Sequence, residues 1–201
     1  VAGPGTINAL GNIIQESLAG DGHTTANTAV VDFGNDSLAQ TWTIYGGYGP
    51  ELRLNSASDA NDQIVFQAAG FLNGLDITAG FSGTVNISNP SNYTFYLGDG
   101  DYTQAAGTFN QGNWNLHLYA NSGCTLSAGT FNGSTATTTI GHHFTISGGT
   151  FNAATTTEFI CTSCGNLTID GATTETFYDL VFNSSNTVRV ISSGDTLVVD
   201  N

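Results

Sequence analysis

Three groups of residues in this chain have the types and spacing that redox, metal or acid–base chemistry needs. Cys161 and Cys164 form a CxxC pair, His142 and His143 are adjacent, and aspartates cluster in two short segments. A CxxC pair acts in redox chemistry at a helix N-terminus, and it binds zinc when a second pair of ligands is present. Cys124 is the only further cysteine. The pattern therefore predicts a disulfide, either local or between subunits, or idle thiols, and it does not indicate a metal site.

The histidines are also weak candidates for metal ligands. Neighbouring side chains in a strand point to opposite faces, so His142 and His143 are expected not to share an ion. His117 is expected on an outward position of a strand. We expect all three histidines to be surface residues.

The aspartate clusters place oxygen atoms of the kind that calcium prefers close together. Asp99 and Asp101 flank a glycine, and Asp59 and Asp62 flank Ala-Asn. Neither spacing matches an EF-hand loop or the calcium-binding nonapeptide repeat. We expect solvated carboxylates and no cofactor, with calcium as the alternative.

An enzyme ranks third among the possible functions. Lyases that act on acidic polysaccharides need cationic side chains, and this chain has no lysine and only two arginines, Arg53 and Arg189. Glycoside hydrolases need two carboxylates that face a common groove, and nothing in the sequence fixes such a pair. The chain has neither a nucleophile elbow nor a phosphate-binding loop. We predict that the protein is not an enzyme.

The charge of the chain excludes further classes of function. Sixteen acidic residues against two basic ones give a net charge of −14. Such a chain repels nucleic-acid phosphates and anionic lipid, so no nucleic-acid partner is expected. No run of about 20 apolar residues is present, so no membrane insertion is expected.

The polar, lysine-free composition suggests an extracellular or cell-surface location. Six N-glycosylation sequons occur, and each is a candidate site if the protein is secreted. They are Asn35, Asn86, Asn92, Asn132, Asn166 and Asn183.

A repeat organises the part of the chain that must position these residues. The sequence Gly-Thr-Phe-Asn begins at Gly107, Gly129 and Gly149, at spacings of 22 and 20 residues. Runs that alternate apolar and polar residues flank each copy, which is typical of half-buried strands. Stacked copies would build a parallel β-solenoid with two strands per turn, and the alternative is a β-sandwich. The register places Leu118, Ile140, Cys161 and Phe182 in one inward column; the motif glycines lie in turns.

The chain divides into three parts in this interpretation. Residues 1–23 form an arm with a helix over residues 6–18, which acts as a cap or as a subunit contact. Residues 24–74 form an irregular β region, and residues 75–201 form the solenoid turns. The last strand has no covering segment, so a neighbouring copy is expected to cover it. The candidate interface residues are Ile7, Leu10, Ile14, Leu18, Leu197, Val198 and Val199.

Three segments resemble the repeats of large secreted microbial surface proteins. They are Asn-Leu-Thr-Ile at residues 166–169, Thr-Phe-Tyr-Asp-Leu-Val-Phe-Asn at 176–183 and Gly-Asp-Thr-Leu-Val-Val at 194–199. The resemblance covers residues 102–201 and implies β-solenoid arrays found in adhesins, sheaths and filaments. We therefore predict a non-enzymatic, extracellular subunit that stacks head to tail with copies of itself. The alternative is an adhesin or glycan-binding module, in which Trp42, Tyr45, Tyr48 or Trp114 would stack on sugars.

Overall fold

The computed structural model describes most of the chain and shows only strands. The described residues are 5–9, 11–16, 29–33, 39–55, 61–68, 70–88, 93–98, 100–119, 122–161, 166–171, 174–183 and 188–200. Within these ranges there is no helix, and every pair of hydrogen-bonded strands is parallel. The fold is the predicted β-solenoid, and the parallel pairing rules out the sandwich.

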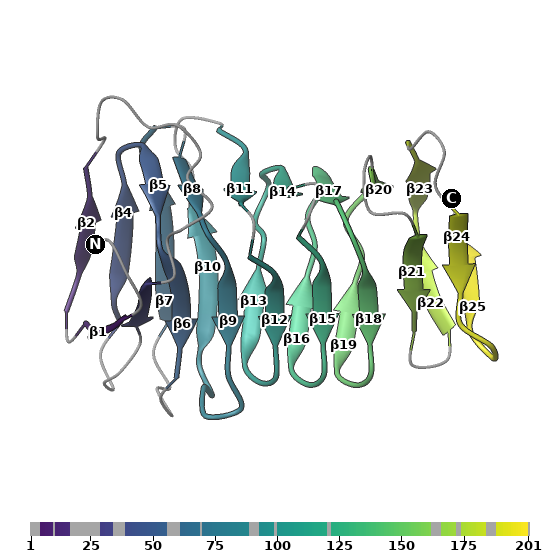
Figure 1. Cartoon of the computed structure of the whole chain (residues 1–201), viewed down its shortest axis with the longest axis horizontal. Helices are drawn as coiled ribbons and strands as arrows, with labels where there is room; N and C mark the ends of the chain where they lie inside the picture. Colours follow the sequence, from purple (N-terminus) through teal and green to yellow (C-terminus); the bar gives the residue numbers. More distant parts are fainter. Residues whose placement is uncertain are drawn as a thin grey trace.

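Three long sheets form the sides of the solenoid (Figure 1). Sheet A contains β1 (Gly5–Asn8), β3 (Ala29–Phe33), β6 (Glu51–Leu54), β9 (Leu75–Ile77), β12 (Tyr102–Gln104), β15 (Cys124–Leu126), β18 (Phe144–Ile146), β21 (Asn166–Asp170) and β24 (Val188–Ile191). Sheet B contains β2 (Ile13–Gln15), β4 (Thr41–Ile44), β7 (Asn61–Phe66), β10 (Thr84–Ser88), β13 (Thr108–Asn110), β16 (Thr130–Asn132) and β19 (Thr150–Asn152). Sheet C contains β5 (Gly47–Gly49), β8 (Gly70–Leu72), β11 (Phe95–Leu97), β14 (Leu116–Leu118), β17 (Thr137–Ile140), β20 (Thr156–Phe159) and β23 (Asp179–Phe182).

Each complete turn adds one strand to sheets A, B and C in that order. The turns follow one another along the long axis of the molecule, from the N-terminal to the C-terminal end (Figure 1). Near the C-terminus, β22 (Thr174–Phe177) and β25 (Thr196–Val199) form a separate two-stranded sheet D. Sheet D follows sheet B, but β22 is not hydrogen-bonded to β19.

The prediction of two strands per turn was wrong, because the Gly-Thr-Phe-Asn motif itself contains the third. Its Thr-Phe-Asn part forms β13, β16 and β19, in which the phenylalanine points inward. The glycine before each strand has φ between +59° and +85°, the left-handed region that other residues rarely adopt. The chain therefore changes direction at this glycine, and the alternation of apolar and polar residues continues directly after it in the next strand.

The core consists of columns of like side chains. Phe109, Phe131 and Phe151 are stacked with ring centroids 5.3 and 5.0 Å apart. Leucine, isoleucine and phenylalanine fill most of the corresponding inward positions of sheets A and C, and Tyr102, Gln104, Thr138 and Thr157 are among the exceptions. Burial of this apolar surface is the main source of stability, since each turn can bury its inner face only against its neighbours.

The predicted inward column was wrong at one member. Ile140 is paired with Phe159, and Phe159 with Phe182. Cys161 lies two residues further along and is fully buried. A shift of two residues keeps the apolar–polar alternation intact, so it leaves no trace in the sequence pattern.

The N-terminal helix was also wrong. Residues 5–8 and 13–15 form β1 and β2, which start sheets A and B. The apolar residues have helical spacing, but Gly11 lies in the middle of the segment and Ile13-Ile14 is β-branched, which both favour an extended chain. The strands between Ala29 and Leu72, read from sequence as an irregular region, belong to the same three sheets as the later turns.

Two substitutions on β17 test the register. Ile140→Asp places a charge without a partner in the core and is expected to prevent folding. Thr137→Asp, at an outward position of the same strand, should leave the urea midpoint nearly unchanged. Circular dichroism during urea titration measures both, and similar midpoints for the two variants would contradict the register.

Candidate interaction surfaces

The two cysteines that the structure describes, Cys124 and Cys161, are buried inside the solenoid. Cys161 is fully buried and disulfide-bonded. Cys164, the other member of the CxxC pair, lies outside the described residues. Cys124 is a free thiol at an inward position of β15. Burial, with a smaller contribution from the charge of Asp101, raises the pKa of Cys124 to about 12. A thiol of this kind is protonated at neutral pH and is therefore a poor nucleophile.

The adjacent histidines face one another, contrary to the prediction. The Nδ1 atoms of His142 and His143 are 3.1 Å apart, and Nε2 of His143 lies 3.3 Å from Oγ1 of Thr125. The two residues precede β18 rather than belonging to a strand, so the strand rule of opposite faces does not apply. Among the described residues, no three histidine, cysteine or acidic side chains gather around a possible metal position.

The described members of the aspartate clusters hold backbone amides. The expectation of a solvated carboxylate was wrong for Asp62, which is fully buried and accepts a hydrogen bond from the backbone N of Gln40 at 2.9 Å. Asp101 accepts one from the backbone N of Gly123 at 2.8 Å. Asp59 and Asp99 lie outside the described residues. Asp62 and Asp101 thus act in holding adjacent turns together.

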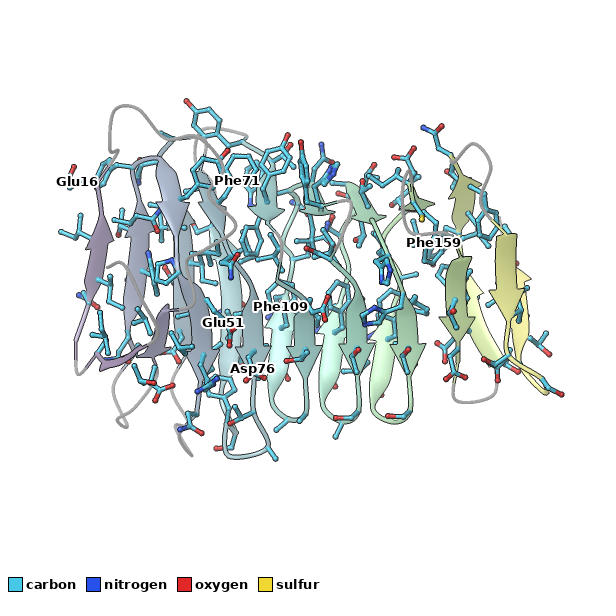
Figure 2. All side chains as sticks on the ribbon, in the orientation of Figure 1. Glu16, Glu51, Phe71, Asp76, Phe109 and Phe159 are labelled. Atoms are coloured by element: carbon cyan, nitrogen blue, oxygen red, sulfur yellow. The ribbon has the colours of Figure 1, made fainter. Side chains whose placement is uncertain are left out.

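Sheet A carries a cluster of charges on its outer face (Figure 2). Arg53 lies 3.2 Å from Asp76, 3.4 Å from Glu51 and 3.8 Å from Asp32. Asp32, Arg53 and Asp76 occupy one column in β3, β6 and β9. Burial raises the pKa of Glu51, Arg53 opposes this shift, and the charges of Asp76 and Asp32 add to it. One arginine thus allows several carboxylates to stack on one face.

Sheet C carries a ladder of rings on its outer face. Tyr48, Phe71 and Tyr96 are stacked, with successive centroids 4.6 Å apart, and His117 follows at 5.2 Å from Tyr96. His117 is outward, as predicted, and burial lowers its pKa while the charge of Glu158 acts in the opposite direction. Because the rings cover one another's faces, the ladder presents ring edges to solvent. Phe71 and Tyr96 have a ring neighbour on both sides and therefore offer no open ring face to a sugar, whereas Tyr48 is the first ring of the ladder.

The other aromatic residues predicted to be exposed lie in different environments. Trp42 is buried in the core, which removes it as a sugar-binding residue. Trp114 is partly buried against the core, and Tyr45 is exposed.

The sequons occupy different environments. Asn86 and Asn132 belong to a hydrogen-bonded ladder on sheet B, and Asn183 is exposed and donates to Oε1 of Glu158 at 2.9 Å. Asn166 begins β21. Asn35 and Asn92 lie outside the described residues.

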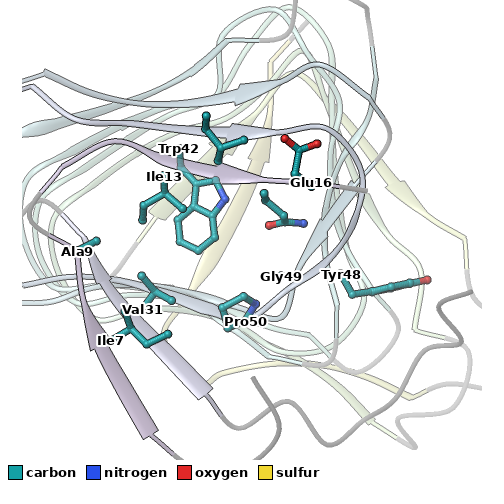
Figure 3. A pocket seen from close by; sticks show the side chains of 11 residues that line it. Ile7, Ala9, Ile13, Glu16, Val31, Trp42, Tyr48, Gly49 and Pro50 are labelled. Carbon is teal, nitrogen blue, oxygen red and sulfur yellow. The ribbon is translucent and has the colours of Figure 1, made fainter. Parts of the chain in front are cut away.

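The N-terminal end of the solenoid has an apolar hollow of about 430 Å³ (Figure 3). Ile7, Ala9, Ile13, Val31 and Trp42 line its interior. The predicted contact residues Ile7 and Ile14 are exposed, Ile14 by 63%. Leu10 and Leu18 lie outside the described residues.

The C-terminal end exposes inward side chains of the last strands. Ile191 and Val199 pair with the buried Ile169 and Phe177, yet they are 48% and 52% exposed because no described turn covers them. Phe182 is exposed in the same way, although it stacks on Phe159. Val198 is exposed as well, and Leu197 packs against the core.

Part of this end surface was not predicted from the sequence. The predicted contact residues at this end all lie on β25, whereas Phe182 on β23 and Ile191 on β24 were not among them. Both residues belong to the last copy of a repeated strand, and this position could have indicated that they are exposed.

The comparisons with known proteins add no further identification. No family model, curated protein or solved structure matched the chain. The resemblance of residues 102–201 to secreted surface proteins therefore remains an expectation. In the part of the chain that the structure describes, no helix is long and apolar enough to cross a membrane.

The pKa of Cys124 predicts how stability changes in alkali. An unfolded thiol ionises near pH 9, whereas the folded thiol keeps its proton to about pH 12. The free energy of unfolding should therefore fall as the pH rises from 9 to 12. In the Cys124→Val variant this decline should be less steep, although the buried Tyr102, whose pKa is also raised, keeps part of it. Urea titrations at several pH values measure this, and equal slopes would contradict the assigned burial of the thiol.

Proposed function

We propose that this protein is a non-enzymatic structural subunit that adds end to end to copies of itself. The observation that carries the proposal is the position of the exposed aliphatic side chains. Among the described residues, all the large aliphatic side chains that are exposed lie on the first two strands or on β23, β24 and β25. They are Ile7, Ile14, Val181, Ile191, Val198 and Val199.

The two ends have complementary properties. The C-terminal end presents Phe182, Ile191 and Val199 at inward positions, and the N-terminal end presents a hollow lined by apolar side chains. Among the described strands, the first and last of each sheet have a strand neighbour on one side only, and such an edge can pair with another chain. A second copy placed in register would bury the apolar side chains and extend the parallel ladders, as one turn does for the next.

The polarity of the stack determines the kind of assembly. The two ends differ in sequence, so a contact between them is heterologous and produces a filament unless a rotation closes it. The chain carries a net charge of −14, so copies repel one another at low ionic strength. Assembly should therefore strengthen with added salt.

An extracellular or cell-surface location belongs to this proposal. The disulfide at Cys161 supports it, because structural disulfides persist in oxidising compartments.

Two charge substitutions test the stacking. Ile7→Asp blocks the N-terminal end, and Phe182→Asp blocks the C-terminal end, so each variant alone should remain monomeric where the parent polymerises. Tyr119→Asp is the matched control, because Tyr119 on the side of the solenoid is 39% exposed and Phe182 is 36% exposed. This control should polymerise like the parent in light scattering and electron microscopy.

Mixing the two end variants gives the decisive measurement. One has a free C-terminal end and the other a free N-terminal end, so the mixture should form complexes of two chains and stop there. Multi-angle light scattering measures the mass. Filaments from either variant alone, or a mixture that remains monomeric while the parent polymerises, would contradict end-to-end stacking.

A further inference from the structure

The outer face of sheet B carries two parallel ranks of small polar side chains. One rank is formed by threonines and the other by asparagines. The sheet B strands β10, β13, β16 and β19 each contribute one residue to each rank. The threonines are Thr84, Thr108, Thr130 and Thr150, and the asparagines are Asn86, Asn110, Asn132 and Asn152. Every member pairs with its equivalent on the next strand, so both ranks are straight.

The asparagine rank is fixed by its own hydrogen bonds. The Nδ2 atom of each side chain donates to Oδ1 of the preceding one, at 2.7, 2.8 and 2.7 Å from the first pair to the last. The stacked rings of Phe109, Phe131 and Phe151 lie beneath the same strands and hold the backbone from the inside. The amide groups are therefore ordered before any ligand arrives.

The two ranks form a regular two-dimensional grid. Neighbouring strands of a sheet are about 4.8 Å apart, and side chains two residues apart along a strand are about 6.6 Å apart. Each rank thus repeats at about 4.8 Å along the solenoid axis, and the two ranks lie about 6.6 Å apart across the face. The repeats are similar to those between water oxygen atoms on the prism faces of ice.

This face is also uncharged. The outward residues of β4 and β7 that precede the grid are Thr41, Thr43, Gln63 and Val65. No outward residue of sheet B from β4 to β19 is charged, although the chain has a net charge of −14. Sheet A, in contrast, carries Asp32, Arg53 and Asp76 on its outer face. A strongly hydrated charge would disturb an ordered water layer, and none is present on the grid.

We propose that the threonine–asparagine grid of β10, β13, β16 and β19 binds ice. The threonine hydroxyls and asparagine amides donate and accept hydrogen bonds to lattice water, and the threonine methyl groups order the water between them. The partner is a neutral crystal with a repeating surface, which fits an uncharged, repeating face. This activity is independent of end-to-end assembly.

The test measures thermal hysteresis and ice recrystallisation with the whole chain, in the end-blocked Phe182→Asp background so that filaments play no part. This protein should separate the freezing and melting points and should partition into growing ice. Thr130→Tyr places a bulky ring in the middle of the threonine rank and should abolish both effects.

Thr145→Tyr is the matched control. Thr145 lies at an outward position of β18 on sheet A, in the turn after Thr130, with similar partial exposure. This variant should retain the activity, and thermal melts must show that both variants fold. A parent without hysteresis, or equal losses in the two variants, would overturn the proposal. So would binding to crystalline chitin or cellulose that Thr130→Tyr abolishes, without any effect on ice.

Discussion

The structure depends on one constraint: each turn must place every side chain directly against its equivalent in the turns above and below. In parallel, in-register strands this distance is about 4.8 Å, so a residue type can recur in successive turns of a column only if it can stack on itself. Phenylalanine stacks by its ring faces and asparagine by amide hydrogen bonds, as in the ladders of Phe109 and Asn110. Carboxylates repel one another, and this explains why the charged column of sheet A contains Arg53 between Asp32 and Asp76.

The same constraint separates the three faces chemically. Because a column keeps its character over several turns, sheet A carries charges, sheet C rings, and sheet B neutral hydrogen-bonding groups. The sides of the solenoid are in this way independent surfaces on a common core, and the ends are the places where that core reaches solvent.

The repeat in the sequence was sufficient to predict the fold, because alternation and period report directly on inward and outward positions. It could not predict the number of strands per turn, since the glycine corner before Phe109 leaves no break in the alternation. It also could not distinguish Phe159 from Cys161, as a shift of two residues preserves the pattern. The end surfaces were partly predicted from β25. Phe182 was predicted to lie in the core, but it is exposed because no described turn lies above it. A local sequence pattern does not show whether a further turn covers a strand.

The break between sheets B and D has a mechanical consequence. The six complete turns are joined by backbone ladders on all three sides, whereas, among the described strands, the turn of β21, β22 and β23 is joined to its predecessor through sheets A and C only. A hollow of about 270 Å³, lined in part by Phe151, Thr176 and Tyr178, lies where the third ladder would be. Under tension along the axis, this seam bears the load on two ladders and yields before the regular turns. The last strands would then swing open as a flap while the body of the rod keeps its shape.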